Sequence, residues 1–224
     1  MLRTRHEIRL LERRTLEEPA ALHKRPAVIA IFDYGAGNLR SVENTLAEIG
    51  CEYQLVRDAE GLRRASKIVL PGVGHFGQMM RALDQLEVRE SLADCIAGGT
   101  PFLGICLGMQ ALFEWSEEAP EVRGFNVFSG VVRRFPAHAR VPHMGWNELA
   151  VRPNATLFEG LAERPYVYFA HSYYAPVGDY ASATCEYDVV YTAALEQGNV
   201  YGVQFHPEKS GPIGLKVVRN FIEC

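Results

Sequence analysis

The sequence lacks an excess of basic residues and has no long apolar run. Its 224 residues include 23 Lys and Arg against 27 Asp and Glu, which gives a formal net charge of −4. A basic patch usually marks a nucleic-acid-binding domain, so this balance argues against a nucleic-acid partner. A membrane-spanning helix needs about 20 consecutive apolar residues, and no segment approaches that length. We therefore expect neither a nucleic acid nor a membrane as a partner.

A paired or metal-binding set of cysteines is also missing. The five cysteines are odd in number and widely spaced, and they include no Cys-x-x-Cys pair. This pattern argues against a disulfide framework and against a zinc site. Free thiols fit a reducing compartment, and the first 26 residues contain no apolar stretch of the kind found in secretory signals. We expect a cytoplasmic protein that uses neither a metal nor a cofactor.

The composition changes after residue 26. Residues 1–26 are dense in Arg and Glu, which predicts an extension that is disordered or loosely attached. From Val28 onward the apolar pattern becomes regular, and the remaining length suits one well-buried core. We therefore expect residues 27–224 to form a single domain.

Apolar strands alternate with helical patterns in the first half of this domain. Because such alternation is typical of a parallel sheet covered by helices, the fold class is predicted to be α/β. The second half has shorter strand patterns, which predict a small antiparallel patch beside the mostly parallel central sheet. The main strands are expected at residues 28–32, 53–56, 67–70, 101–105, 131–135, 166–174, 181–186, 192–196 and 200–204, and helices at 107–115 and 215–222, among others.

Cys106 lies where a buried strand is expected to run into a helix. Gly104 and Gly108 stand two residues to either side, which is the spacing of a nucleophile elbow. Unpaired N–H groups at the start of the helix favour a thiolate and can stabilise an oxyanion. The alternative is a buried structural cysteine, a common fate for this residue. A catalytic interpretation therefore requires a base and a group that orients the base.

His206 and Glu208 meet both requirements. His206 follows the last predicted strand, Pro207 stops that strand, and a turn could bring the Glu208 carboxylate to the imidazole. Cys106, His206 and Glu208 then form a nucleophile, a base and an orienting group. A metal site that combines His206 with His143 or His171 is the weaker alternative, because no cluster has metal-ligand spacing.

Six segments, in this order, resemble those of class I glutamine amidotransferases. The Cys106 elbow and the His-Pro-Glu segment at 206–208 are shared by many amidotransferases, but Pro-His-Met-Gly-Trp-Asn at 142–147 is much more specific to the glutaminase subunits of imidazole glycerol phosphate synthases. The resemblance covers Val28 to the C-terminus and implies the class I glutamine amidotransferase fold. The segments are residues 33–39, 71–74, 104–110, 141–147, 171–173 and 201–208.

The resemblance implies hydrolysis of L-glutamine to glutamate and ammonia. Cys106 would attack the carboxamide, His206 would move the proton, and Glu208 would hold His206. The oxyanion and substrate-binding groups implied by the resemblance are Gly72, Val73, Gly74, Leu107, Gln110, Ser172 and Tyr173.

The same resemblance implies a partner, a cyclase subunit with a (β/α)8 barrel that forms a heterodimer with this chain. The partner would receive the ammonia through a channel and make imidazole glycerol phosphate and an aminoimidazole carboxamide ribotide in histidine biosynthesis. Core packing is the alternative role for Met144 and Trp146, although Met and aromatic residues are also enriched at interfaces. The residues expected at or near the interface are Asn38, Met144, Trp146, Tyr168 and Lys209.

Three other functions are compatible with parts of this pattern. The chain could be a glutaminase subunit of another synthase, but residues 142–147 argue against that. It could be a non-catalytic binding subunit of the same fold, although the complete Cys, His and Glu set argues against it. It could also be a free-standing cysteine hydrolase, which would not need an interface segment with Met144 and Trp146.

Overall fold

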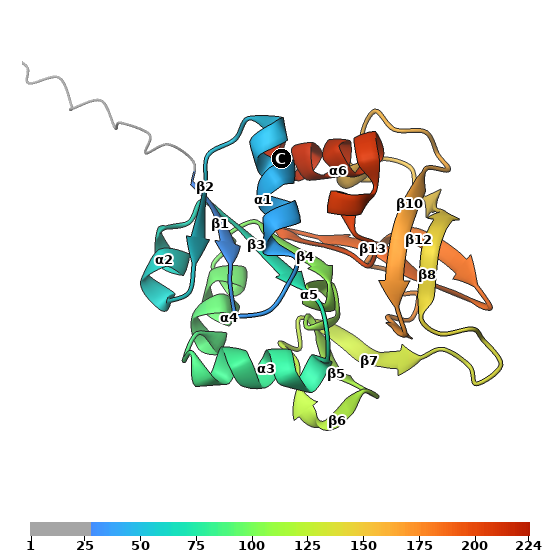
Figure 1. Cartoon of the computed structure of the whole chain (residues 1–224), viewed down its shortest axis with the longest axis horizontal. Helices are drawn as coiled ribbons and strands as arrows, with labels where there is room; N and C mark the ends of the chain where they lie inside the picture. The colour runs from blue at the N-terminus through green and yellow to red at the C-terminus, as the bar shows by residue number, and fades with distance from the viewer. Residues whose placement is uncertain (1–27) are drawn as a thin grey trace, which may run out of the picture.

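Eight strands form the central sheet of the computed structural model, which describes residues 28–224 (Figure 1). Their order is β2-β1-β3-β4-β14-β13-β12-β9. The first five run parallel to one another, and the last three continue the sheet in antiparallel pairing. These strands are β1 (Ile29–Phe32), β2 (Tyr53–Val56), β3 (Lys67–Gly72), β4 (Phe102–Cys106), β9 (Ala150–Val151), β12 (Ala181–Tyr187), β13 (Val189–Gln197) and β14 (Val200–Val203).

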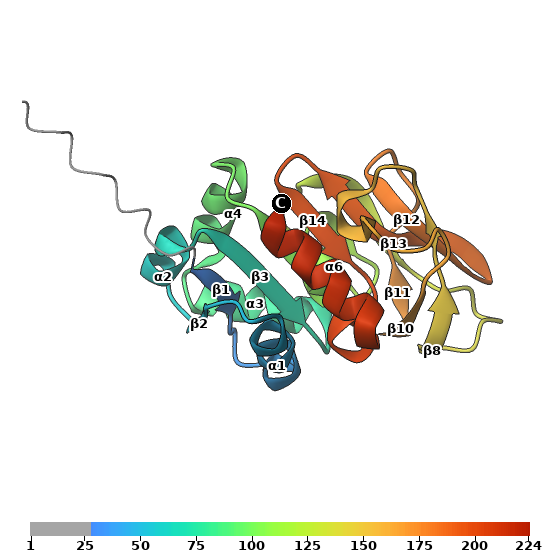
Figure 2. The same cartoon turned by 90° about the horizontal axis from the view of Figure 1, so that it is seen from above.

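Helices cover both faces of the parallel half of this sheet. Helices α1 and α6 pack on one face, while α2, α3 and α4 lie on the other (Figure 2). The short helix α5 directly follows β4. The helices are α1 (Leu39–Ile49), α2 (Ala59–Arg64), α3 (Phe76–Gln85), α4 (Arg89–Ala97), α5 (Leu107–Gln110) and α6 (Gly211–Glu223), with 3-10 turns η2 (Thr156–Phe158) and η3 (Pro207–Lys209).

The apolar run of β1 explains why both faces are covered. Ile29 and Ile31 belong to the core cluster shared with α1 and α6, whereas Ala30 and Phe32 belong to the cluster shared with α2, α3 and α4. All four side chains are buried. Because successive strand residues point to opposite faces, a continuous apolar run requires a cover on each side.

Two smaller sheets complete the antiparallel part of the fold. One pairs β8 (His143–Glu148) with β10 (Tyr166–His171), and the other has the order β11-β7-β5-β6. The predicted fold class is confirmed, although the antiparallel strands are more numerous than a small patch. The second sheet consists of β5 (Phe113–Ser116), β6 (Ala119–Arg123), β7 (Phe128–Arg134) and β11 (Tyr173–Tyr174).

The helix expected over residues 107–115 is wrong in its second half. Helix α5 ends at Gln110, and Phe113 already belongs to β5. The Ala111 carbonyl accepts a hydrogen bond from Phe125 N–H, and the Leu112 carbonyl accepts from Val127 N–H. These carbonyls therefore bond across to the following loop rather than to the next helical turn.

The predicted extension over residues 1–26 lies outside the described residues. Within residues 28–224, no helix is both long enough and apolar enough to cross a membrane.

We predict that Gly108→Ala destabilises the fold strongly. A Cβ atom at Gly108 would lie 1.9 Å from the Leu70 carbonyl oxygen, so β3 and α5 would have to move apart. The expected loss is about 3 kcal/mol or more in the free energy of unfolding, measured by urea denaturation. Gly50→Ala is the matched control, because Gly50 has a φ of +83° but open space around it. That change should cost only about 1 kcal/mol from backbone strain, and equal losses would contradict the packing argument.

Candidate active site

The candidate site lies at the carboxyl ends of β3, β4 and β14, which are neighbours in the sheet. Ligands of open α/β sheets bind at this edge of the strands. Cys106 and His206 both line a cavity of about 170 Å³ there. Of the seven oxyanion and substrate-binding residues predicted from the sequence, Gly72 does not line the cavity but pairs with Cys106 between β3 and β4. The other six line it: Val73, Gly74, Leu107, Gln110, Ser172 and Tyr173.

Cys106 sits at the junction of β4 and α5 in a strained backbone conformation. Its φ is 53° and its ψ is −108°, which is unusual for a residue with a side chain. The chain can turn this sharply because three glycines allow close contact. A Cβ at Gly72 would lie 2.6 Å from the Gly108 nitrogen, and one at Gly104 would lie 2.6 Å from the Gly108 carbonyl carbon. The sequence prediction of a nucleophile elbow therefore agrees with the backbone geometry.

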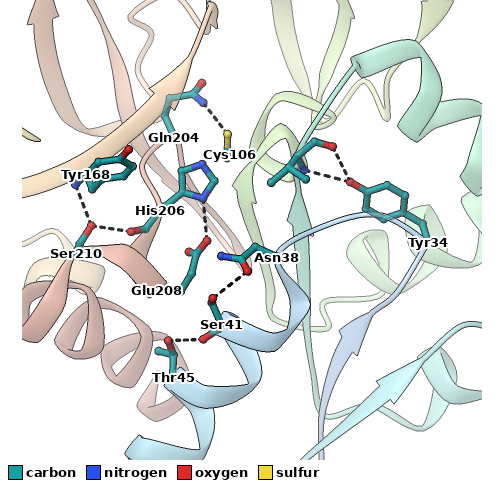
Figure 3. A network of polar contacts seen from close by, with 11 residues as sticks. Tyr34, Asn38, Ser41, Thr45, Cys106, Tyr168, Gln204, His206, Glu208 and Ser210 are labelled. Atoms are coloured by element: carbon teal, nitrogen blue, oxygen red, sulfur yellow. Dashed lines mark hydrogen bonds and ion pairs between the residues drawn. The ribbon is translucent and has the colours of Figure 1, made fainter. Parts of the chain in front are cut away.

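His206 lies between Cys106 and Glu208 (Figure 3). The His206 Nδ1 is 2.8 Å from the Glu208 Oε1, and the two side chains are only 4% and 2% exposed. The main chain fixes the histidine as well, since His206 N–H donates to the Tyr168 carbonyl and Ser210 Oγ donates to the His206 carbonyl. The structure thus brings together the three residues that the sequence singles out.

The charges around His206 favour its protonated form. Burial lowers the pKa of His206, but the Cys106 sulfur and the Glu208 carboxylate both attract its proton and together raise the pKa to about 10. The imidazole therefore carries a proton at neutral pH and places it beside the Cys106 sulfur. A cysteine next to a protonated histidine is the arrangement of an activated nucleophile.

Two buried side-chain amides, those of Gln204 and Gln110, form a hydrogen-bonded chain that reaches the Cys106 sulfur. Gln204 Nε2 lies 3.6 Å from the Cys106 Sγ, and Gln204 Oε1 accepts a hydrogen bond from Gln110 Nε2 at 2.9 Å. The same Gln110 nitrogen donates to the Tyr173 carbonyl at 2.8 Å. Sequence reasoning missed Gln204, although strand alternation places it on the same side as His206, two residues later.

The loop after β3 forms the opposite wall of the cavity. Val73 is 37% exposed, and Gly74 has a φ of +96°. The Val73 N–H donates to the Tyr34 hydroxyl at 3.2 Å, and this hydroxyl donates back to the Val73 carbonyl at 3.3 Å (Figure 3). Tyr34 itself is buried. The N–H of Val73, one of the residues expected from the sequence to bind the oxyanion or the substrate, is thus bonded to a protein side chain.

Two further histidines, His143 and His171, form a buried hydrogen-bonded chain, and His171 also lines the cavity. Tyr191 Oη is 3.2 Å from His143 Nδ1 and 3.3 Å from His171 Nε2, and His171 Nδ1 is 2.9 Å from the Tyr173 carbonyl. Burial lowers the pKa of His143 to about 4 and that of His171 to about 3. These histidines therefore hold the wall around Ser172 and Tyr173 in place as neutral groups. Within residues 28–224, no group of three or more His, Cys, Asp or Glu side chains could hold a metal ion.

Glu118 is a second residue that sequence reasoning missed. It lines the cavity from the turn between β5 and β6, and its Oε2 accepts a hydrogen bond from Phe76 N–H at the start of α3. In the sequence it stands in the run Ser116-Glu117-Glu118, which is typical of an exposed turn. Nothing local distinguishes it from Glu117, because only the fold brings it to the cavity.

Four of the five residues expected at the partner interface form one surface cluster. Met144 and Trp146 are 65% and 56% exposed, which excludes core packing. Trp146 lies opposite Tyr168 in the β8–β10 pair, and Lys209 Nζ lies 5.6 Å above the Tyr168 ring. Asn38 is separate from this cluster and lies near Glu208, with its Oδ1 accepting from Ser41 Oγ (Figure 3).

Comparison with known proteins identifies the family of this chain. The family model for class-I glutamine amidotransferases matches residues 30–224. The chain belongs to this family. It is 50% identical over 197 residues to the imidazole glycerol phosphate synthase subunit HisH of Methanothermobacter thermautotrophicus, which covers 88% of this chain and 98% of that protein.

Further relatives agree with this assignment. The HisH subunit of Bacillus mycoides is 43% identical over 195 residues, or 87% of this chain and 93% of that protein. The structure of PurLQS from Thermotoga maritima has the same fold, with a TM-score of 0.69 at 22% identity, over 89% of this chain and 99% of that one. The amidotransferase fold and the HisH relationship predicted from the sequence are both confirmed.

The lowered pKa values of His143 and His171 predict a loss of stability in mild acid. Both histidines stay neutral when folded but take up protons in the unfolded chain below its pKa of about 6.5. Their contribution is therefore complete above pH 6.5 and falls as the pH drops toward 4. Between pH 7 and 5.5 each should cost roughly 1 kcal/mol in the free energy of unfolding, measured by urea denaturation.

His143→Gln should remove about half of this pH-dependent loss, whatever it does to stability at pH 7. His138→Gln is the control, because the His138 side chain is 75% exposed and lies outside the buried chain. An unchanged slope in His143→Gln would contradict the interpretation. The raised pKa of His206 acts in the opposite direction, because its contribution to stability is lost as the pH rises from 6.5 toward 10. It is the same in His143→Gln and in the unmodified chain, so the difference between their slopes reports on His143.

Proposed function

We propose that this amidotransferase hydrolyses L-glutamine to glutamate and ammonia with Cys106, His206 and Glu208, and delivers the ammonia to a cyclase subunit. The observation that carries the proposal is the buried set of three side chains, of which Cys106 and His206 line one cavity and Glu208 lies behind His206. His206 Nδ1 is 2.8 Å from Glu208, and Cys106 lies on the other side of the imidazole. The names of the HisH relatives support imidazole glycerol phosphate synthase as the enzyme to which the glutaminase belongs.

In the first half-reaction the Cys106 thiolate attacks the carboxamide carbon of glutamine. The carbonyl oxygen becomes an oxyanion, for which the N–H of Leu107 at the start of α5 is one donor. His206 gives its proton to the nitrogen as the C–N bond breaks. Ammonia leaves, and a glutamyl thioester remains on Cys106.

In the second half-reaction His206 is neutral and acts as a base. It takes a proton from water, which attacks the thioester carbon, and the C–S bond breaks to release glutamate. The proton on His206 and the thiolate on Cys106 are then restored. The Glu208 carboxylate fixes the imidazole through Nδ1, so that Nε2 faces the sulfur.

Glutamine also carries an ammonium and a carboxylate that the site must recognise. We assign the ammonium to Glu118, whose carboxylate lines the same cavity as Cys106. The backbone of Ser172 and Tyr173, held by His171 and Gln110, forms the facing wall. Charge-assisted hydrogen bonds of this kind contribute more than neutral ones.

Ammonia released into water would be protonated, which favours a closed path to a partner. The exposed cluster of Met144, Trp146, Tyr168 and Lys209 supplies an aromatic and apolar surface of the kind found at interfaces. It adjoins the site, because the Tyr168 carbonyl accepts the His206 N–H. We propose this cluster, with Asn38, as the docking surface of a (β/α)8-barrel cyclase in a heterodimer.

The proposed cyclase would use the ammonia to make imidazole glycerol phosphate and aminoimidazole carboxamide ribotide in histidine biosynthesis. All five cysteines are unpaired, which supports a reducing compartment such as the cytoplasm. A free-standing hydrolase of this fold would be equally active without a partner, so glutamate release measured with and without the cyclase distinguishes the two functions.

Cys106→Ala should abolish glutamine hydrolysis, with a loss of more than about a thousandfold, because it removes the nucleophile. In the complex with the cyclase, product formation from added ammonium salt should survive, since the partner carries out that step. Glutamate release and cyclase product are measured in parallel, with glutamine or ammonia as nitrogen source. Unmodified chain without the cyclase should release glutamate slowly.

The matched control is Cys95→Ala, a buried cysteine of α4 that lies away from the cavity. It should keep both activities. Loss of the ammonia-dependent activity in Cys106→Ala would contradict the division of labour between the two subunits. Equal glutamate release with and without the cyclase would favour the free-standing hydrolase.

Glu118→Gln should raise the KM for glutamine about tenfold and leave kcat nearly unchanged, because it removes the charge that meets the substrate ammonium. The variant keeps an oxygen that can accept the Phe76 N–H, so the start of α3 is preserved. Steady-state kinetics of the complex measure both constants. Glu117→Gln, one residue earlier and exposed, is the control, and an equal rise in KM there would argue against a specific contact.

A further inference from the structure

We propose that Gln204 is a further catalytic residue, whose side-chain amide donates a hydrogen bond to the Cys106 sulfur and holds the sulfur facing His206. The inference deepens the proposed glutaminase function and rests on it. Gln204 contacts the reacting sulfur directly, so its effect should appear in the rate of the reaction and not only in the stability of the fold.

The end of β14 places Gln204 at the sulfur. Gln204 directly follows that strand, and its backbone N–H donates to the Ala193 carbonyl of β13 at 2.8 Å. Because alternate residues of an extended segment point to the same side, Gln204 and His206 both face Cys106 (Figure 3). Gln204 is fully buried, so its amide must find its partners within the protein.

A backbone carbonyl determines which end of the Gln204 amide meets the sulfur. The Tyr173 carbonyl can only accept, so the Gln110 atom that lies 2.8 Å from it is the nitrogen Nε2. That nitrogen lies 2.9 Å from Gln204, whose atom at this contact is therefore the acceptor Oε1. The other end of the Gln204 amide is then Nε2, which lies 3.6 Å from the Cys106 Sγ. The chain of amides thus presents an N–H donor to the sulfur.

A neutral amide suits this contact. It donates a hydrogen bond to the sulfur but cannot take the thiol proton, so proton transfer is left to His206. In the low dielectric of the interior such a bond is stronger than in water. The Cys106 sulfur is therefore held by the imidazole and by the Gln204 amide, which favours the geometry required for attack on the carboxamide.

Gln204 also anchors Gln110, and kinetics separate the two roles. Gln110 lines the cavity, so loss of its bond to Gln204 loosens the wall that meets glutamine and raises KM. Loss of the bond to the sulfur misplaces the nucleophile and lowers kcat. A role limited to holding the wall would therefore change KM alone.

Gln204→Met tests the proposal because methionine has a similar length and no N–H. We expect kcat for glutamine hydrolysis by the complex with the cyclase to fall about tenfold, with a rise in KM below about threefold. Gln204→Glu keeps an oxygen for the Gln110 N–H, but its carboxylate offers no donor to the sulfur. It should lower kcat at least as much and leave KM constant.

Gln54→Met is the matched control, because it makes the same change at an exposed glutamine of β2 outside the cavity. It should leave kcat and KM unchanged. Urea denaturation and ammonia-dependent product formation check that each variant is folded. A kcat retained in either Gln204 variant, or a change confined to KM, would overturn the proposal. Glutamine hydrolysis that survives in Cys106→Ala, assayed alongside, would overturn the proposed function instead.

Side-chain amide NMR tests the contact without any measurement of activity. The Gln204 Nε2 proton signals of the unmodified chain should shift in Cys106→Ala, because the sulfur that accepts their hydrogen bond is gone. The Asn220 amide donates to the Leu157 and Glu159 carbonyls away from the site, so its signals should not move. Gln204 signals that stay in place when the sulfur is removed would overturn the proposal.

Discussion

The site depends on one backbone constraint, the close approach of β3, β4 and α5 around Cys106. A side chain at Gly72, Gly104 or Gly108 would collide with backbone atoms of these elements at 2.6 Å or less. This contact forces Cys106 to a φ of 53° and presents its sulfur at the end of the sheet. The strain of about 1–3 kcal/mol is sustained because three packed elements determine the conformation together.

Burial of the other two catalytic candidates determines their charge state. His206 and Glu208 have almost no exposed side-chain area, so the imidazolium is stabilised by the Cys106 sulfur and the Glu208 carboxylate rather than by water. Removing either partner would leave a buried charge without its counterpart, which destabilises a protein interior. In the proposed mechanism the three side chains therefore act together, and the neutral state of His171 nearby avoids a competing positive charge.

The sequence alone was sufficient to predict those groups of site residues that lie close together in the chain. Cys106 and its glycines lie within five residues, and His206 and Glu208 within three, so their arrangement follows from strand and turn patterns. The end of α5 was not predictable in the same way, because the Leu112 carbonyl bonds to Val127 and not within a helix. Glu118 and Gln204 were missed because their roles arise from contacts across the fold; Gln204 bonds Gln110, 94 residues away.

The two walls of the site differ in how firmly they are held, and this difference decides where regulation can act. His206 is fixed by Glu208, by the Tyr168 carbonyl and by Ser210, so a change on this side would disrupt several bonds at once. The Val73 loop is exposed and has hydrogen bonds to one hydroxyl, that of Tyr34, within the described side-chain contacts. A modest interaction energy can therefore reorient the Val73 loop, which lines the proposed active site, while Cys106 and His206 stay in place.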